Sequence, residues 1–170
     1  MSWELKFMKW GVGPRRSRFL YHVLPWVTHL GSHFAVILFV LVTWITTKQL
    51  RVLFGFLLLY AIQSFIIYFL KFIVRRKRPL PRHEMKSRVS KGPGEIIDPS
   101  FPSAHTTFSF MMATVLAFYF PRYQVIFFLI AGFIGWTRIY LGLHYPTDVI
   151  GGALLGYGIT KAYIFFYFSR

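Results

Sequence analysis

Long apolar segments that lack acidic and basic residues recur along this chain, and they limit its fold more strongly than any other feature. The first lies between Phe19 and Thr47 and contains no Lys, Arg, Asp or Glu. Hydrophobic residues make up 55% of the sequence and the mean hydropathy is +0.50. A helix satisfies its backbone hydrogen bonds internally and crosses a bilayer with about 20 apolar residues. The sequence therefore predicts an all-α, polytopic membrane helical bundle.

Proline and glycine divide the first apolar segment. Pro25 and the Gly31-Ser32 pair disfavour one straight helix, so we separate a short amphipathic lead-in, Phe19–Leu30, from the first spanning helix. The later apolar runs, each bounded by basic or turn-forming residues, predict four more spans. The five expected spans cover residues 32–47, 52–72, 103–120, 123–138 and 146–168.

The length of 170 residues fits a single membrane domain, residues 1–170, without a second globular unit. Residues 1–31 would form an N-terminal interfacial lead-in. Residues 1–18 mix Trp and Phe with basic side chains, which suits a segment lying on the membrane surface. A basic tail without fixed structure fits that composition almost as well.

The chain is strongly basic, with 20 Lys and Arg against five Asp and Glu and a formal net charge of +15. Such an excess implies an anionic partner, and in a membrane protein the nearest anion is lipid rather than nucleic acid. Cysteine is absent, so thiolate chemistry and cysteine metal sites are excluded. The remaining His, Asp and Glu show no metal-ligand spacing, and we expect neither a metal nor another cofactor.

Basic residues cluster where the second span ends. Lys71 lies on the helical continuation of that span, and Arg78 follows seven residues later on nearly the same face. An ionisable side chain near hydrocarbon depth is costly, so a functional role is the default hypothesis, here the binding of a tetrahedral phosphate. A solvated lipid-binding loop is the alternative. We expect the neighbouring cations to face lipid headgroups: Arg75, Arg76, Lys77 and Arg82.

A second cluster, Pro102-Ser103-Ala104-His105, opens the third span. The free N–H groups and dipole of a helix N-terminus favour an anion. Ser103 alone is compatible with an ordinary N-cap. The adjacent His105 favours chemistry, because an imidazole can carry a proton at physiological pH.

A third cluster joins the fourth and fifth spans. Arg138 ends one helix, and His144 and Asp148 flank Pro146 at the start of the next. From this position Asp148 could orient His144, fix its tautomer and stabilise its imidazolium. Taken singly, Asp148 could instead be a helix-start residue and His144 an interfacial aromatic. We interpret His22, His29 and His33 mainly as interfacial residues, and His83 as part of the basic loop.

Alternating helix direction brings the three clusters together. The end of the second span, the start of the third, the end of the fourth and the start of the fifth all lie at one face of such a bundle. The converging residues are Lys71, Ser103, His105, Arg138, His144 and Asp148. Their convergence predicts one polar site suited to phosphate.

The three ordered motifs resemble those of the type 2 phosphatidic acid phosphatase superfamily of membrane lipid phosphatases. The motifs are Lys71-x6-Arg78-Pro79, Pro102-Ser103-Ala104-His105 and Thr137-Arg138-x5-His144-x3-Asp148, within residues 71–148. Two positions depart from the usual pattern, Ala104 for Gly and Thr137 for Ser. Many members of the superfamily have six spans rather than five.

The resemblance implies a metal-independent double displacement through a phosphohistidine. His144 would attack phosphorus with support from Asp148, and His105 would protonate the leaving oxygen. The phosphoryl oxygens would be held by Lys71, Arg78, Ser103, Arg138 and the backbone N–H of Ala104. Two imidazoles on opposite sides suit an in-line phosphoryl transfer.

The predicted function is hydrolysis of a phosphate or diphosphate from an anionic membrane lipid. The resemblance offers lipid A 1-phosphate, undecaprenyl diphosphate and phosphatidylglycerophosphate as substrates. The net charge of +8 between Lys71 and Lys91 favours a large, multiply charged headgroup, so the first two lead. The alternative is a non-enzymatic anionic-lipid-binding membrane protein. The resemblance implies a bacterial inner membrane location with the active site on the extracytoplasmic face. The positive-inside rule would instead place the basic loop in the cytoplasm, but phosphate binding itself requires many of those cations.

Overall fold

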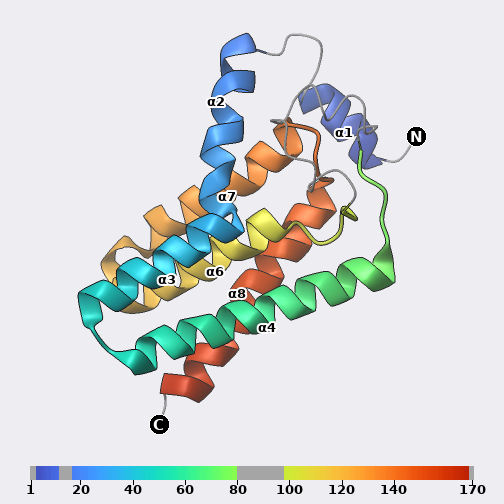
Figure 1. The fold of residues 1–170 in the computed structure, drawn as a ribbon. Coiled ribbons are helices and arrows are strands. Elements are labelled where there is room, and N and C mark those ends of the chain that lie inside the picture. The colour runs from blue at the N-terminus through green and yellow to red at the C-terminus, as the bar shows by residue number, and fades with distance from the viewer. Residues whose placement is uncertain (1–2, 12–16, 80–97, 169–170) are drawn as a thin grey trace.

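The computed structural model in Figure 1 describes residues 3–11, 17–79 and 98–168, and these residues form helices joined by short connections. No strand occurs in these ranges. The helical elements are α1 (Trp3–Gly11), α2 (Arg18–Thr28), η1 (His29–Gly31), α3 (His33–Thr47), α4 (Leu50–Val74), α6 (Ala104–Tyr119), η2 (Pro121–Tyr123), α7 (Gln124–Tyr140) and α8 (Pro146–Phe168).

Helix α6 forms the centre of the bundle. It packs along both α7 and α8, and α3 and α4 lie beside it (Figure 1). Apolar residues of α3, α4 and α6 share one core, which includes Val36, Phe56, Leu59, Phe108 and Met111. Many large apolar side chains of α3, α4, α7 and α8 remain exposed, as expected for helices that face lipid.

Three elements are long and apolar enough to cross a membrane by themselves: α4, η2 with α7, and α8. The stretch His22–Gly31, in α2 and η1, meets α3 at an angle of 51°, and the two would make a fourth span if they count as one bent element. These helices confirm the predicted membrane bundle. The count of five spans is not confirmed, because α6, with 16 residues, is shorter than an ordinary span.

The break before α3 lies where the sequence predicts it, at Gly31-Ser32. The Ser32 hydroxyl accepts a hydrogen bond from the Ala35 N–H and caps α3. A Cβ on Gly31 would lie 2.6 Å from the carbonyl oxygen of His105, so glycine permits this turn to touch α6. The expected interruption at Pro25 is wrong, since α2 continues through that residue to Thr28.

Glycines of α8 allow its close packing on α6. A Cβ on Gly152 would lie 2.7 Å from the carbonyl oxygen of Ser103, and one on Gly156 would meet the backbone of Thr107. Gly158 differs, because a Cβ there would meet nothing within 4 Å. The close contact of α6 with α8 fixes the N-terminus of α6 beside the first turn of α8.

Candidate active site

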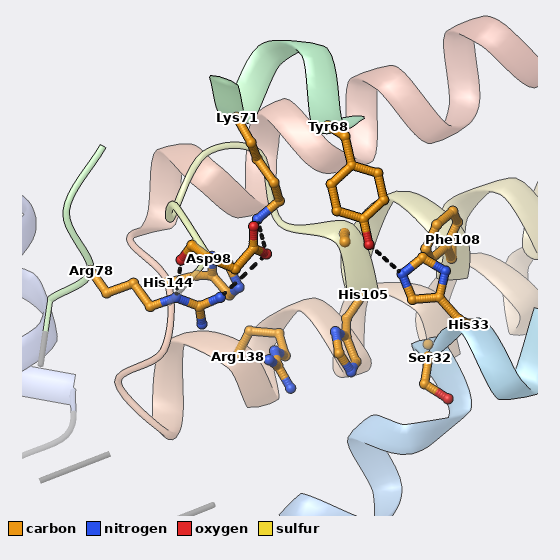
Figure 2. Close-up of a pocket in the computed structure, with 12 residues that line it drawn as sticks. Ser32, His33, Tyr68, Lys71, Arg78, Asp98, His105, Phe108, Arg138 and His144 are labelled. Atoms are coloured by element: carbon orange, nitrogen blue, oxygen red, sulfur yellow. Dashed lines mark hydrogen bonds and ion pairs between the residues drawn. The ribbon is translucent and has the colours of Figure 1, made fainter. Parts of the chain in front are cut away.

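The three sequence clusters meet at one end of the bundle, around a cavity of about 330 Å³. Figure 2 shows the side chains of this cavity converging from α3, α4, α6 and α7 and from the connections next to them. The predicted residues that line it are Lys71, Arg78, Ala104, His105, Arg138 and His144. Ser103 and Asp148 are fully buried beside it. The structure therefore brings together the six residues predicted to converge, and also Arg78 and Ala104.

His144 occupies the short connection between α7 and α8. Its backbone N–H and that of Leu143 donate to the carbonyl oxygen of Arg138, which fixes the turn after α7. The Nδ1 atom lies 2.7 Å from the carbonyl oxygen of Ser100. A carbonyl only accepts hydrogen bonds, so Nδ1 carries the proton and Nε2 keeps its lone pair. This tautomer suits a nucleophile.

The surroundings of His144 keep its imidazole neutral. The side chain is only 2% exposed, and this burial lowers the pKa of His144 to about 3, against the opposing effect of the Asp148 carboxylate. The nearby cations Arg78, Arg138 and Lys71 lower the pKa further. At neutral pH the lone pair of Nε2 is therefore available.

Asp148 supports His144 less directly than the sequence predicts. Its Oδ2 lies 3.8 Å from Nδ1 of His144, beyond hydrogen-bond distance. The same oxygen accepts from the Ser100 hydroxyl at 2.5 Å and from the Tyr145 N–H at 2.8 Å. Asp148 thus fixes both the segment whose carbonyl binds His144 and the turn that carries His144, while its negative charge lies close to the imidazole.

Arg76 does not face lipid headgroups, contrary to the sequence prediction. Its NH1 lies 2.7 Å from Oδ1 of Asp148, and its NH2 lies 2.5 Å from Oε2 of Glu4 in α1. Glu4 is itself buried and also accepts from the Thr147 hydroxyl. Two buried carboxylates attract the guanidinium more strongly than the membrane surface does. The N-terminal helix is thereby tied to Asp148.

The other predicted headgroup cations divide into two groups. Arg75 and Lys77 are exposed, and Arg75 lies over the ring of Phe72, so their expected contact with headgroups stays a prediction. Arg82 and His83 lie outside the described residues.

The cations that the sequence predicts to bind phosphate approach the cavity from separate elements. The ammonium of Lys71, whose side chain is 3% exposed, lies 2.6 Å from both Oδ2 of Asp98 and the carbonyl oxygen of Pro99. Arg78 Nε donates to the carbonyl oxygen of Asp98. Arg138 is almost fully buried and donates to the Thr28 hydroxyl. These positive charges suit the oxygens of a phosphoryl group.

The N-terminus of α6 faces the same cavity through Ala104 and His105. The Ser103 hydroxyl does not cap the helix, because it accepts from Thr106 instead. The Ser103 N–H donates to the carbonyl oxygen of Asp148. The following N–H groups have no acceptor within their own helix, which favours an anion at this point.

Sequence reasoning missed several residues of the site. Asp98 lines the cavity, and Ser100 binds both His144 and Asp148. His33 also lines the cavity and bonds to the Tyr68 hydroxyl, so its interpretation as mainly interfacial is wrong (Figure 2). The position of Asp98 and Ser100, immediately before the second motif, was the available signal.

Comparison with known proteins identifies the family. The PAP2 superfamily pattern matches residues 52–170, and the chain belongs to this superfamily. Lipid A 1-phosphatase of Rhizobium johnstonii is 41% identical over 68 residues, which are 39% of this chain and 28% of that protein. Undecaprenyl-diphosphatase BcrC of Bacillus subtilis is 32% identical over 107 residues, 61% of this chain and 51% of that protein. The matches thus span about half or less of these relatives.

Two solved structures share the fold along almost the whole chain. The PAP2 type phosphatidylglycerolphosphate phosphatase of Bacillus subtilis superposes with a TM-score of 0.77 at 24% identity, covering 98% of this chain and 85% of that one. LpxE of Aquifex aeolicus gives a TM-score of 0.76 at 25% identity, covering 96% of both chains.

Proposed function

We propose that this chain is a membrane lipid phosphatase that removes a phosphate or diphosphate group from an anionic lipid without a metal. The observation that carries the proposal is the pairing of His144 and His105 in one cavity with Lys71, Arg78 and Arg138. Membership in the PAP2 superfamily, with phosphatases among the relatives, supports the same reaction class.

In the first step Nε2 of His144 attacks phosphorus, and the bond from phosphorus to the lipid oxygen breaks. Protonated His105 donates its proton to that oxygen, so the lipid leaves as an alcohol, or as a phosphate monoester from a diphosphate. The negative phosphoryl group itself stabilises the imidazolium of His105. Lys71, Arg78 and Arg138 hold the equatorial oxygens, and the first N–H groups of α6 face the same charge.

In the second step neutral His105 takes a proton from water, and the water oxygen attacks the phosphohistidine. The bond between phosphorus and His144 breaks, releasing inorganic phosphate and the neutral imidazole. The Ser100 carbonyl keeps the proton of His144 on Nδ1 throughout. Asp148 balances the positive charge that His144 gains on phosphorylation.

The leading substrates are lipid A 1-phosphate and undecaprenyl diphosphate, with phosphatidylglycerophosphate as a further one. The first two lead because relatives named for them share sequence with this chain. We further propose a multi-pass location in the bacterial inner membrane, with the cavity on the extracytoplasmic face.

A lipid panel tests the proposal. Purified protein in detergent, supplied with each of the three lipids and a chelator, should release inorganic phosphate from at least one. His144→Ala should release none and should form no acid-labile phosphoprotein. The absence of release from every lipid, with lipid binding retained, would instead favour a non-enzymatic lipid-binding protein.

A further inference from the structure

Asp98 places a negative charge inside a cavity built for anions. Among the described side chains that line the cavity, it is the only carboxylate. Its Oδ2 lies 2.6 Å from the ammonium of Lys71 and 3.7 Å from NH2 of Arg78 (Figure 2). These are two of the three cations proposed to hold the phosphoryl oxygens. The carboxylate therefore bonds where a phosphoryl oxygen would otherwise bind.

The carboxylate is not needed to hold either cation in position. Lys71 also donates to the carbonyl oxygen of Pro99, and Arg78 Nε donates to the backbone carbonyl oxygen of Asp98 itself. Both contacts involve main-chain atoms and survive a change of side chain at position 98. Backbone carbonyls thus orient the cations, while the side chain of Asp98 supplies only charge.

The side chain of Asp98 is more exposed than those of Lys71 and Arg78, and this difference permits an entering anion to replace the carboxylate. The side chains of Lys71 and Arg78 are 3% and 8% exposed, whereas that of Asp98 is 31% exposed. A half-buried carboxylate regains water when it rotates out, but a buried ammonium has no comparable alternative. An entering anion would therefore displace Asp98 and leave the cations in place.

We propose that Asp98 is a specificity residue, an internal anion that occupies the phosphate site until a phosphoryl group of higher charge replaces it. This inference rests on the proposed function and deepens it. A phosphodiester carries one negative charge, the same as the carboxylate, so replacing Asp98 brings no additional negative charge to the cations. A terminal phosphate monoester or diphosphate carries about two charges and gains one. Asp98 thus excludes the phosphodiester headgroups of bulk lipid from a strongly cationic cavity.

The test compares Asp98→Asn with the wild-type protein in detergent, using inorganic phosphate and dimethyl phosphate as probes in calorimetry. We expect Asp98→Asn to bind phosphate about tenfold or more tightly, and to bind dimethyl phosphate where the wild-type protein does not. Asp98→Glu should resemble the wild-type protein. Gln49→Lys adds the same net charge at an exposed position at the far end of α4 and should change neither affinity.

The outcomes separate this inference from the proposed function. Equal or weaker phosphate binding by Asp98→Asn would overturn the inference, because Asp98 would then only hold the cations. Tighter binding together with no turnover of any lipid would keep the inference and refute the phosphatase. Binding of phosphate by neither protein would overturn the inference, while the turnover of lipids alone decides the proposed phosphatase. If Asp98→Asn does not fold, Asp98→Ala tests the same expectation, since the backbone carbonyls that accept from Lys71 and Arg78 remain.

Discussion

Arg76 and Asp148 form an ion pair behind the proposed nucleophile, with 2.7 Å between NH1 and Oδ1. Asp148 is fully buried, and the guanidinium that neutralises it comes from the segment after α4. The same guanidinium binds Glu4. Three distant parts of the chain therefore contribute to the charge balance beside His144.

Replacement of Arg76 by Gln should reduce turnover more than substrate binding. Loss of the partner of a buried charge costs about 3–5 kcal/mol of stability, and the altered Asp148 would position His144 poorly. We expect kcat to fall about 10- to 100-fold with little change in KM, because Arg76 does not line the cavity. Steady-state kinetics and thermal unfolding measure both effects. Arg75→Gln removes an exposed charge next to Arg76 and should leave kcat and the thermal stability nearly unchanged.

Ser100→Ala separates the two contacts of Ser100. The variant loses the hydroxyl that donates to Asp148 but keeps the carbonyl that binds His144. A hydrogen bond to a charged group contributes about 1.5–3 kcal/mol, so we expect turnover to fall roughly 10- to 100-fold, less than in Asp148→Asn. A loss in Ser100→Ala as large as that in Asp148→Asn would contradict this order of effects.

The low pKa of His144 makes folding stability dependent on pH. Unfolded His144 binds a proton near pH 6.5, whereas the folded protein resists protonation until about pH 3. The unfolded state therefore binds more protons in this range, and the free energy of unfolding should fall as the pH decreases from 6.5. Thermal unfolding of the wild-type protein and His144→Gln between pH 7 and pH 4 measures the difference, which we expect to amount to a few kcal/mol, on the order of 1.4 kcal/mol per pH unit. Parallel curves for the two proteins would rule out this source of pH dependence.

If His105 is the general acid, the loss of rate in a His105 variant should depend on the leaving group of the substrate. A general acid contributes about 10²–10⁴-fold when the leaving oxygen is a poor leaving group. With a lipid phosphate, we expect His105→Asn to slow the first step by this factor. With p-nitrophenyl phosphate, whose leaving group needs no proton, the rate of the first step should fall much less. The burst of p-nitrophenol and the trapped phosphohistidine report that step. Equal losses with both substrates would argue against proton donation by His105.

Two glycines of α8 provide a matched test of packing. Gly152→Ala would force a Cβ to within 2.7 Å of the Ser103 carbonyl, so α6 and α8 must separate. Overpacking of this kind costs about 1–3 kcal/mol. Gly158→Ala meets nothing within 4 Å and should be neutral or stabilising by up to about 1 kcal/mol through helix propensity. Unfolding in detergent should show Gly152→Ala less stable than the wild-type protein and Gly158→Ala at least as stable as it.

The sequence predicts the bundle and the main residues of the site because both follow from local patterns. Apolar runs give the helices, and alternating direction brings Lys71, His105 and His144 to one end. The contacts of Ser100 and Glu4 could not be predicted, since they join residues 44 and 143 positions apart. Arg76 was misassigned for the same reason. Its partners are distant in sequence, and only the fold places them within reach.

His33 shows a second limit of sequence reasoning. A histidine at the start of an apolar helix is typical of an interfacial residue. The bend at Gly31-Ser32 instead turns it toward α4, where it stacks on Tyr68 and bonds to Tyr60. The position of the bend was predicted, but its angle, which decides what His33 contacts, was not.

The hydrogen bond from the Ser103 N–H to the carbonyl oxygen of Asp148 joins the start of α6 to the first turn of α8. Because α6 also packs closely on α7, the elements beside His105, His144 and Arg138 contact one another extensively, whereas Lys71 belongs to α4, which contacts α3 more than any other helix. Substitutions at Lys71 or Asp98 should therefore change anion binding while leaving the relative placement of His105 and His144 nearly unchanged.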